Sequence, residues 1–249
     1  MLKNERQNEI IQILNSRGFV SVTELSELLY ASESSIRRDL SRLEERGIVK
    51  RSYGGAECIV SPSHVLPFDT RNCDFVEEKN TIASKALPLI KDGDVIFIDQ
   101  SSTCYFLALY LRSLKDITVV TNNIEIVSLL SKTNITVHCT GGVISKNNNN
   151  CLIGGAAQAA FERVFADIAF FSARAVSDDG VITDCTEEEV YLRAAMLRNS
   201  AKKVFLCNSA KLGTKAPFVQ CKIGEVDTVI SENDAFRRFK EHYPKLEVL

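Results

Sequence analysis

Residues 31–40 read Ala-Ser-Glu-Ser-Ser-Ile-Arg-Arg-Asp-Leu, and neither Gly nor Pro interrupts the chain from there until Gly47. Ser32 is a residue type that caps helix N-termini, and Gly47 is a typical stop signal. At about 100° per residue, the apolar side chains of this stretch fall on one stripe. They are Ile36, Leu40 and Leu43. The stretch therefore predicts an amphipathic helix with one face in a core.

The other face of this predicted helix, with its flanks, carries hydroxyl groups and arginines. These residues are Ser32, Ser34, Ser35, Arg37, Arg38 and Arg42. Arginine can pair bidentately with guanine, and serine can bond either a base or a phosphate, so the pattern suits a helix end in the major groove. An ordinary helix with a solvated charged face has the same pattern. Charge does not decide between them, because the chain through Glu57 has nine acidic and nine basic residues.

The segments before this helix favour DNA binding. Ser21 and Glu24 have the spacing of a capping box that opens a short helix over 23–29. Tyr30-Ala31 predicts a tight turn, and an earlier helix is expected over 4–16, ended by Gly18. A short helix, a brief turn and a second helix form the helix-turn-helix pattern.

A hairpin is predicted after Gly47. Residues 48–53 have the pattern of a strand, and Gly54-Gly55 that of a turn. This hairpin has the size of the wing of a winged helix. Lys50 and Arg51 lie where such a wing touches phosphates, and Tyr53 is a further candidate DNA contact.

Residues 3–57 together resemble the N-terminal domain of the DeoR-type bacterial repressors. The resemblance rests on Arg6, on the Ser-Ile-Arg-Arg-Asp-Leu core from Ser35, and on the Gly-Gly-Ala wing at 54–56. It implies that the partner is double-stranded operator DNA. Ser35 stands where the family usually has Thr, which removes a methyl group able to contact thymine.

The composition suits a soluble protein of two domains. The chain has 249 residues, 45% of them hydrophobic, and a net charge of -2. No apolar run approaches the roughly 18 residues of a membrane span, and no secretory signal begins the chain, so a cytosolic protein is expected. The eight cysteines include no Cys-x-x-Cys pair, and neither a metal site nor a cofactor is supported. Reduced thiols are expected, with Cys139 and Cys207 in buried strands.

The chain changes character between the two expected domains. Ser61-Pro62-Ser63 and Pro67 break both helical and strand patterns. We expect a DNA-binding domain over 1–57, a linker over 58–75, and an effector-sensing and oligomerisation domain over 76–249.

The second domain alternates strands and helices. Short apolar runs predict strands over 95–98, 117–120, 135–139, 167–171, 204–207 and 226–230. Helices are predicted between them, including one over 187–198. This order predicts an α/β fold with a mainly parallel sheet. Ligands of such sheets bind beyond the carboxyl ends of the strands. Three polar loops are expected there: Gln100–Thr103, Thr121–Asn123 and Thr140–Gly142.

The first of these loops has the pattern of an anion site. Ser101, Ser102 and Thr103 lie at a strand-to-helix junction, where free N–H groups and the helix dipole favour a phosphate. Helix capping alone would place the same residue types there. No Walker or Gly-x-Gly-x-x-Gly sequence supports a nucleotide site of those classes.

Residues 76 to about 230 resemble the DeoR-type sensor domain, which shares a fold with ribose-5-phosphate isomerase and binds sugar phosphates. The effector positions expected from the resemblance and from the loops are Asp99, Gln100, Ser101, Ser102, Thr103, Thr121, Asn122, Asn123, Gly141, Gly142 and Lys211. Three departures leave the effector open. Gln100-Ser101 replaces a usual Ser-Gly, and Asn208 replaces a usual Asp. Phe171-Ser172-Ala173-Arg174 replaces a Gly-containing loop, which makes Arg174 a candidate extra anion contact. Residues 146–150, rich in Asn, are expected to form an exposed loop.

Three functions fit these features. The first is a sequence-specific transcriptional regulator, a repressor of a sugar-metabolism operon controlled by a small phosphorylated sugar and acting as a dimer or tetramer. The second is an enzyme resembling sugar-phosphate isomerases, but the Asp-Gly-Ala-Asp-Glu and Lys-Gly-Gly-Gly segments of those enzymes do not occur. No catalytic residue is therefore predicted. The third is a regulator that answers to a different ligand.

Overall fold

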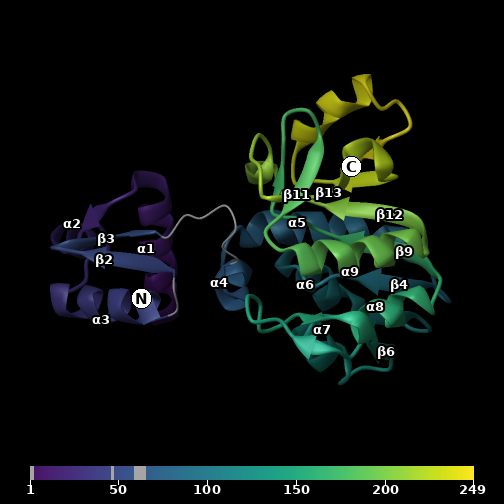
Figure 1. Ribbon diagram of the computed structural model, residues 1–249, viewed down its shortest axis with the longest axis horizontal. Helices are drawn as coiled ribbons and strands as arrows, with labels where there is room; N and C mark the ends of the chain where they lie inside the picture. The colour runs from purple at the N-terminus through teal and green to yellow at the C-terminus, as the bar shows by residue number, and fades with distance from the viewer. Residues whose placement is uncertain (1–2, 46–47, 59–65) are drawn as a thin grey trace. The chain divides into compact units, whose positions relative to one another are not determined.

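The computed structural model describes residues 3–45, 48–58 and 66–249. The chain forms two compact units that divide between Asp74 and Phe75 (Figure 1). Gly47, the predicted helix stop, and Ser61-Pro62-Ser63 of the predicted linker lie outside the described residues.

The N-terminal unit contains the predicted helices and hairpin. Its elements are α1 (Lys3–Arg17), β1 (Val20–Ser21), α2 (Val22–Leu28), α3 (Glu33–Glu45), β2 (Val49–Ser52), β3 (Gly55–Cys58) and α4 (Phe68–Cys73). The strands form one sheet in the order β1-β3-β2. The Ser21 hydroxyl accepts the N–H of Glu24, as expected for the cap of α2. Tyr30, in the turn before α3, has a left-handed φ of 48°.

The core of this unit explains the apolar stripe of α3. Ile36, Leu40 and Leu43 are fully buried, and they pack in one cluster with Ile10 and Leu14 of α1. Helix α4 lies inside the segment assigned to the linker. Its Phe68 is 4% exposed, so this helix buries an apolar side chain that the Pro-rich composition of the segment conceals.

The C-terminal unit is a three-layer α/β fold. Its helices are α5 (Val76–Ala86), α6 (Ser102–Leu111), α7 (Ile124–Leu130), α8 (Gly155–Glu162) and α9 (Glu187–Arg198). The strands of its large sheet are β4 (Val95–Ile98), β5 (Thr118–Thr121), β6 (Thr136–Cys139), β9 (Ala166–Phe171), β12 (Ser200–Leu206), β14 (Thr228–Ile230) and β15 (Glu247–Val248). Their order is β15-β14-β12-β9-β4-β5-β6, and every neighbouring pair is parallel. The predicted fold class is thereby confirmed.

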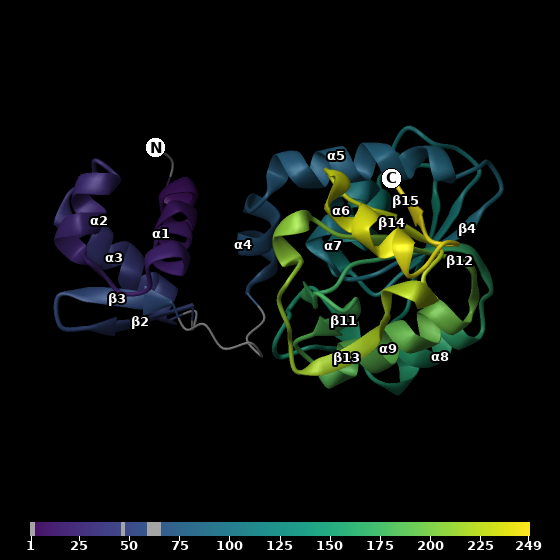
Figure 2. The same ribbon diagram turned by 90° about the horizontal axis from the view of Figure 1, so that it is seen from above.

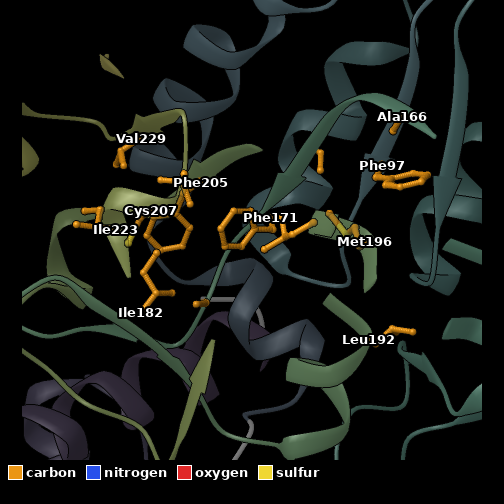
Figure 3. Packing of buried hydrophobic residues seen from close by; sticks show 14 of the residues in the cluster. Phe97, Ala166, Phe171, Ile182, Leu192, Met196, Phe205, Cys207, Ile223 and Val229 are labelled. Atoms are coloured by element: carbon orange, nitrogen blue, oxygen red, sulfur yellow. The ribbon is translucent and has the colours of Figure 1, made fainter. Parts of the chain in front are cut away.

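Alternation along the strands divides the core into two layers. Ile96 and Ile98 face a cluster with α5, α6 and α7, whereas Phe97 faces a cluster with α8 and α9. Figures 1 and 2 show the sheet between these two groups of helices. In the second layer the rings of Phe171 and Phe205 lie side by side (Figure 3), with centroids 5.0 Å apart. None of the described helices is long and apolar enough to cross a membrane.

Smaller strands complete the unit. β10 (Ala175–Val176), β11 (Val181–Asp184) and β13 (Phe218–Lys222) form an antiparallel sheet, and β7 (Val143–Ile144) pairs with β8 (Leu152–Ile153). Short 3-10 helices are η1 (Leu87–Leu89), η2 (Ser209–Lys211), η3 (Ile223–Glu225) and η4 (Asp234–Glu241).

The expectation that Cys139 is buried is wrong. Cys139 ends β6, which is an edge strand of the large sheet, and its side chain is exposed. Cys207 is buried as expected, and burial raises the pKa of its thiol to about 12. An apolar run therefore identified both strands but could not tell an edge strand from a central one.

Candidate functional site

Hydroxyl groups gather at the N-terminus of α3. The Ser35 N–H donates to the Ser32 side-chain oxygen at 3.3 Å, so Ser32 caps the helix as predicted. The Ser32 hydroxyl also lies 3.1 Å from that of Ser34 and 3.0 Å from that of Ser35. Short polar groups thus surround the end of the helix that the sequence assigns to the major groove.

The arginines of α3 differ in what they contact. Arg37 forms an ion pair of 3.0 Å with Glu33, whose pKa is lowered mainly by this hydrogen bond. Arg38 donates to two neutral oxygens of its own helix, Ser34 O at 3.3 Å and Ser35 Oγ at 3.4 Å. Two open hollows, of about 320 and 270 Å³, are both lined by Arg38 and Arg42. These two guanidinium groups therefore face accessible concave surface.

Sequence reasoning missed the role of Asp39. This carboxylate is 1% exposed, and it accepts hydrogen bonds from Arg6 Nε at 2.6 Å and Gln7 Nε2 at 3.1 Å. It therefore fixes α3 to α1 rather than facing solvent. Asp39 follows Ile36 by three residues and therefore lies on the apolar stripe of the helix. This position in the sequence could have indicated that its carboxylate is buried.

The three predicted contact residues of the wing are all exposed, but they differ in what they contact. Lys50 is exposed, and Tyr53 lies fully exposed beside the hairpin turn. Arg51 instead donates to Ser41 Oγ at 2.6 Å and lies 3.7 Å from a Glu44 carboxylate oxygen, which ties the wing to α3.

Asp99 stands at the carboxyl end of β4 in the centre of the large sheet. One of its oxygens accepts the Ser101 N–H at 2.9 Å. The other accepts the Ser172 N–H at 3.1 Å and Arg193 Nε at 3.1 Å. Because Asp99 is 1% exposed and its oxygens are engaged, it organises the loops that surround it.

The hydroxyl loop begins α6. Ser101 is the N-cap residue, and its side chain accepts the Cys104 N–H at 3.1 Å. Ser102 and Thr103 occupy the buried first turn, where backbone N–H groups have no acceptor within the helix. Capping therefore occupies Ser101, and the first-turn N–H groups give this helix end the polarity that attracts an anion.

A chain of buried side chains connects three loops. Gln100 Nε2 donates to Glu189 at 2.8 Å, and Asn148 Nδ2 donates to the other oxygen of Glu189 at 3.3 Å. Asn122 Nδ2 lies 3.3 Å from Gln100 Oε1. The expectation that residues 146–150 form an exposed loop is thus wrong at Asn148, which is 3% exposed because Glu189 holds it inside.

Arg193 is a second buried charge on α9. Besides Asp99, it contacts Asp184 Oδ2 and Gln220 Oε1, each at 3.0 Å. Burial by itself lowers the pKa of Arg193, but the nearby carboxylates of Asp184, Asp99 and Glu189 outweigh it and raise the pKa. Arg193 therefore links the Asp99 loop to the small antiparallel sheet.

The other loop residues have local structural roles. Thr121 Oγ1 accepts the Asn123 N–H at 3.1 Å, and Asn123 Oδ1 caps α7. Gly141 and Gly142, after β6, have positive φ values of 68° and 107°. A side chain at Gly142 would collide with the carbonyl oxygen of Ile153. This glycine is therefore required by the close approach of β7 and β8.

Lys211 approaches the same end of the sheet from η2. Its Nζ donates to Ser172 Oγ at 2.9 Å, next to the Ser172 N–H that binds Asp99. Glu232 fixes this turn by accepting hydrogen bonds from the backbone and side chain of Ser209. Burial raises the pKa of Glu232, but hydrogen bonds from Ser209 and Ser231 outweigh it, and the pKa is lowered.

Both units match known families. The DeoR-like helix-turn-helix domain matches residues 6–61, and the DeoR C terminal sensor domain matches residues 74–233. The chain belongs to the DeoR family of transcriptional regulators.

DeoR-family relatives align along almost the whole chain. The HTH-type transcriptional regulator GolR of Listeria innocua is 33% identical over 234 residues, covering 94% of this chain and 92% of GolR. The lactose phosphotransferase system repressor of Staphylococcus epidermidis is 28% identical over 253 residues, covering 100% of both. A solved D-ribose-5-phosphate isomerase in complex with phospho-erythronic acid has a TM-score of 0.42 at 17% identity, covering 55% of this chain and 54% of that one.

In this DeoR-family regulator, Ser172 connects Asp99 to Lys211 by hydrogen bonds. Gln100, the residue after Asp99, is hydrogen-bonded to Asn122. Gly141 and Gly142 are exposed, and no hydrogen bond among the described residues ties them to these groups. The predicted extra contact Arg174 is exposed as well. Sequence reasoning missed Glu189 and Arg193, although their spacing of four residues among the buried Leu192 and Met196 marks an unusual polar stripe inside α9.

Proposed function

We propose that this protein is a sequence-specific repressor of a sugar-metabolism operon, released from or held on DNA by a small phosphorylated metabolite. The observation that carries the proposal is the junction of Asp99, Ser172 and Lys211 beside the N-terminus of α6. A lysine and the free N–H groups of a helix end are a suitable pair for a phosphate. The staphylococcal relative is a lactose phosphotransferase system repressor, which agrees with this class of effector.

The small DNA-contacting surface of one copy supports a homo-oligomer. One α3 helix contacts few base pairs, so selectivity requires two or more copies on neighbouring half-sites. A dimer or a tetramer both satisfy this requirement. An effector shifts such an assembly only by its different affinities for the DNA-bound and free states.

Gel-shift assays test the DNA-binding part. The full-length protein is titrated against the upstream region of its own operon at low salt, with and without sugar phosphates. We expect retardation that specific competitor DNA removes. If the DNA is not retarded in any of these conditions, the proposal of a DNA-binding repressor is contradicted.

Thermal-shift measurements separate a sugar-phosphate effector from another ligand. A phosphorylated sugar that binds the native state raises the melting temperature, because binding favours the folded form. If only unphosphorylated compounds raise it, the regulator answers to a different class of ligand.

Catalysis by the sensor domain is the weaker alternative. A general base needs a lone pair that can take the substrate proton. In Asp99 both oxygens already accept hydrogen bonds, one of them from Arg193. If the protein converts ribose 5-phosphate and the Asp99→Ala variant does not, the sensor domain is an enzyme after all.

Arg38→Ala tests base reading. Because Arg38 lines both hollows on α3 and forms hydrogen bonds only to neutral oxygens among the described residues, its guanidinium is available for a guanine. Its removal is expected to cost roughly 1–3 kcal/mol of operator affinity and little non-specific affinity. Arg17→Ala, on α1, is the control. An equal loss on unrelated DNA would show that Arg38 is not a reader.

Arg51→Ala tests a phosphate contact. The change is expected to weaken operator and unrelated DNA nearly equally, and to reduce the salt slope by about 0.9 for one phosphate lost. The ion pair of Arg51 with Glu44 competes with that phosphate, so Glu44→Gln should strengthen binding to both DNAs. Binding measured from low to moderate salt gives both slopes.

A further inference from the structure

Several buried oxygen atoms near the carboxyl end of the large sheet have no hydrogen-bond partner within the described part of the chain, and three of them belong to residues near Glu189. These three are Asn122 Oδ1, Asn148 Oδ1 and Thr186 Oγ1. The residues are 1%, 3% and 6% exposed. Such atoms are rare in folded proteins, because each loses its hydrogen bonds to water without replacement. Several of them in one neighbourhood indicate a partner that is not part of the chain.

These three residues are grouped around Glu189. Asn148 donates to one carboxylate oxygen of Glu189, and Gln100 donates to the other. Asn122 donates to Gln100 in turn. Thr186 is the N-cap residue of α9, three positions before Glu189, and its side chain makes no capping bond. The N-cap and N3 positions of a helix, here Thr186 and Glu189, are neighbours in its first turn.

The chemistry of the unpaired atoms points to hydroxyl groups. Amide oxygens only accept hydrogen bonds, whereas a threonine hydroxyl can donate or accept. Hydroxyl groups of a ligand can donate to both amide oxygens, and they can accept from the Thr186 hydroxyl, so they satisfy all three atoms.

We propose that Asn122, Asn148 and Thr186, held around Glu189, form a subsite that binds neighbouring hydroxyl groups of a polyol. The inference rests on the proposed function, because the phosphate of the same effector belongs at α6 and Lys211. Thr186, Asn148 and Glu189 then determine which sugar is recognised, and the anion site supplies affinity common to all phosphorylated compounds.

Thr186→Val in the full-length protein tests the subsite. Valine has nearly the shape of threonine and removes a buried hydroxyl that has no partner, so the melting temperature without ligand should stay equal or rise. The probes are inorganic phosphate, fructose 1-phosphate, fructose 6-phosphate and glucitol 6-phosphate, measured by calorimetric titration. The tightest polyol phosphate is expected to bind about tenfold more weakly to the variant, as for one lost hydrogen bond. Inorganic phosphate should bind both proteins equally.

Thr228→Val is the matched control. Thr228 is buried like Thr186, but its hydroxyl donates to Glu247 at 2.9 Å in the β14–β15 pair. This variant should lower the melting temperature and leave the affinity for every probe unchanged.

The outcomes distinguish the two proposals. Equal binding of the tightest polyol phosphate to wild type and Thr186→Val overturns the subsite and leaves a phosphorylated effector standing. If no phosphorylated probe binds, the proposal of a phosphorylated effector is overturned, and the titrations are repeated with glucitol and galactitol. If one of these polyols binds the wild type and binds Thr186→Val more weakly, the subsite is supported. No binding of any polyol overturns it.

Discussion

Arg193→Met is expected to lower the free energy of unfolding of the C-terminal unit by about 3–5 kcal/mol. The change removes the cation and leaves Asp99 and Asp184 as buried carboxylates, with the first 1% exposed. Uncompensated buried charge is the main cost, because methionine fills much of the arginine volume. Urea denaturation of the full chain, followed by circular dichroism, measures the change. Binding of phosphorylated sugars should weaken in parallel, since Asp99 holds the Ser101 and Ser172 loops.

Arg198→Met provides the matched control on the same helix. Arg198 pairs with Glu162 at 3.6 Å, but its side chain is 63% exposed. Exposed pairs contribute about 0–1 kcal/mol, so this variant should unfold nearly as the wild type does. Similar losses in the two variants would mean that the buried network contributes no more than a surface pair.

Asp39→Ala is expected to destabilise the N-terminal unit by about 3 kcal/mol, at the lower end of the range for broken buried pairs. The effect is moderated because the Arg6 side chain is 20% exposed and can still reach water. Operator binding should fall as well, although Asp39 faces the core, because α3 loses its connection to Arg6 and Gln7 of α1. Denaturation curves and gel shifts at one temperature measure both effects.

Glu45→Ala is the control for this prediction. Glu45 is an exposed residue of α3, and its removal should change stability by no more than about 0.5 kcal/mol. Wild-type stability in Asp39→Ala, together with lost operator binding, would instead place Asp39 at the DNA.

Local patterns predicted the elements of both units well. The capped helices around Tyr30-Ala31 and the helix over 187–198 lie where the sequence placed them, because capping groups and apolar periodicity act over a few residues. Composition was less informative between the units, where Phe68–Cys73 forms a helix inside a segment identified by its prolines.

The sequence by itself determined the class of protein. The Ser-Ile-Arg-Arg-Asp-Leu helix, the Gly-Gly wing and the alternating strands specify a winged helix joined to a parallel α/β domain, since each signal is local. Only the tertiary structure decided which polar groups act together. Glu189 and Arg193 come from α9, far along the chain from Asp99 and Gln100, and only the packing of α9 against the sheet brings them into contact. These contacts are needed for stability because a charge buried away from water must be paired with another group. The partner lies far along the chain, so a local sequence pattern cannot identify it.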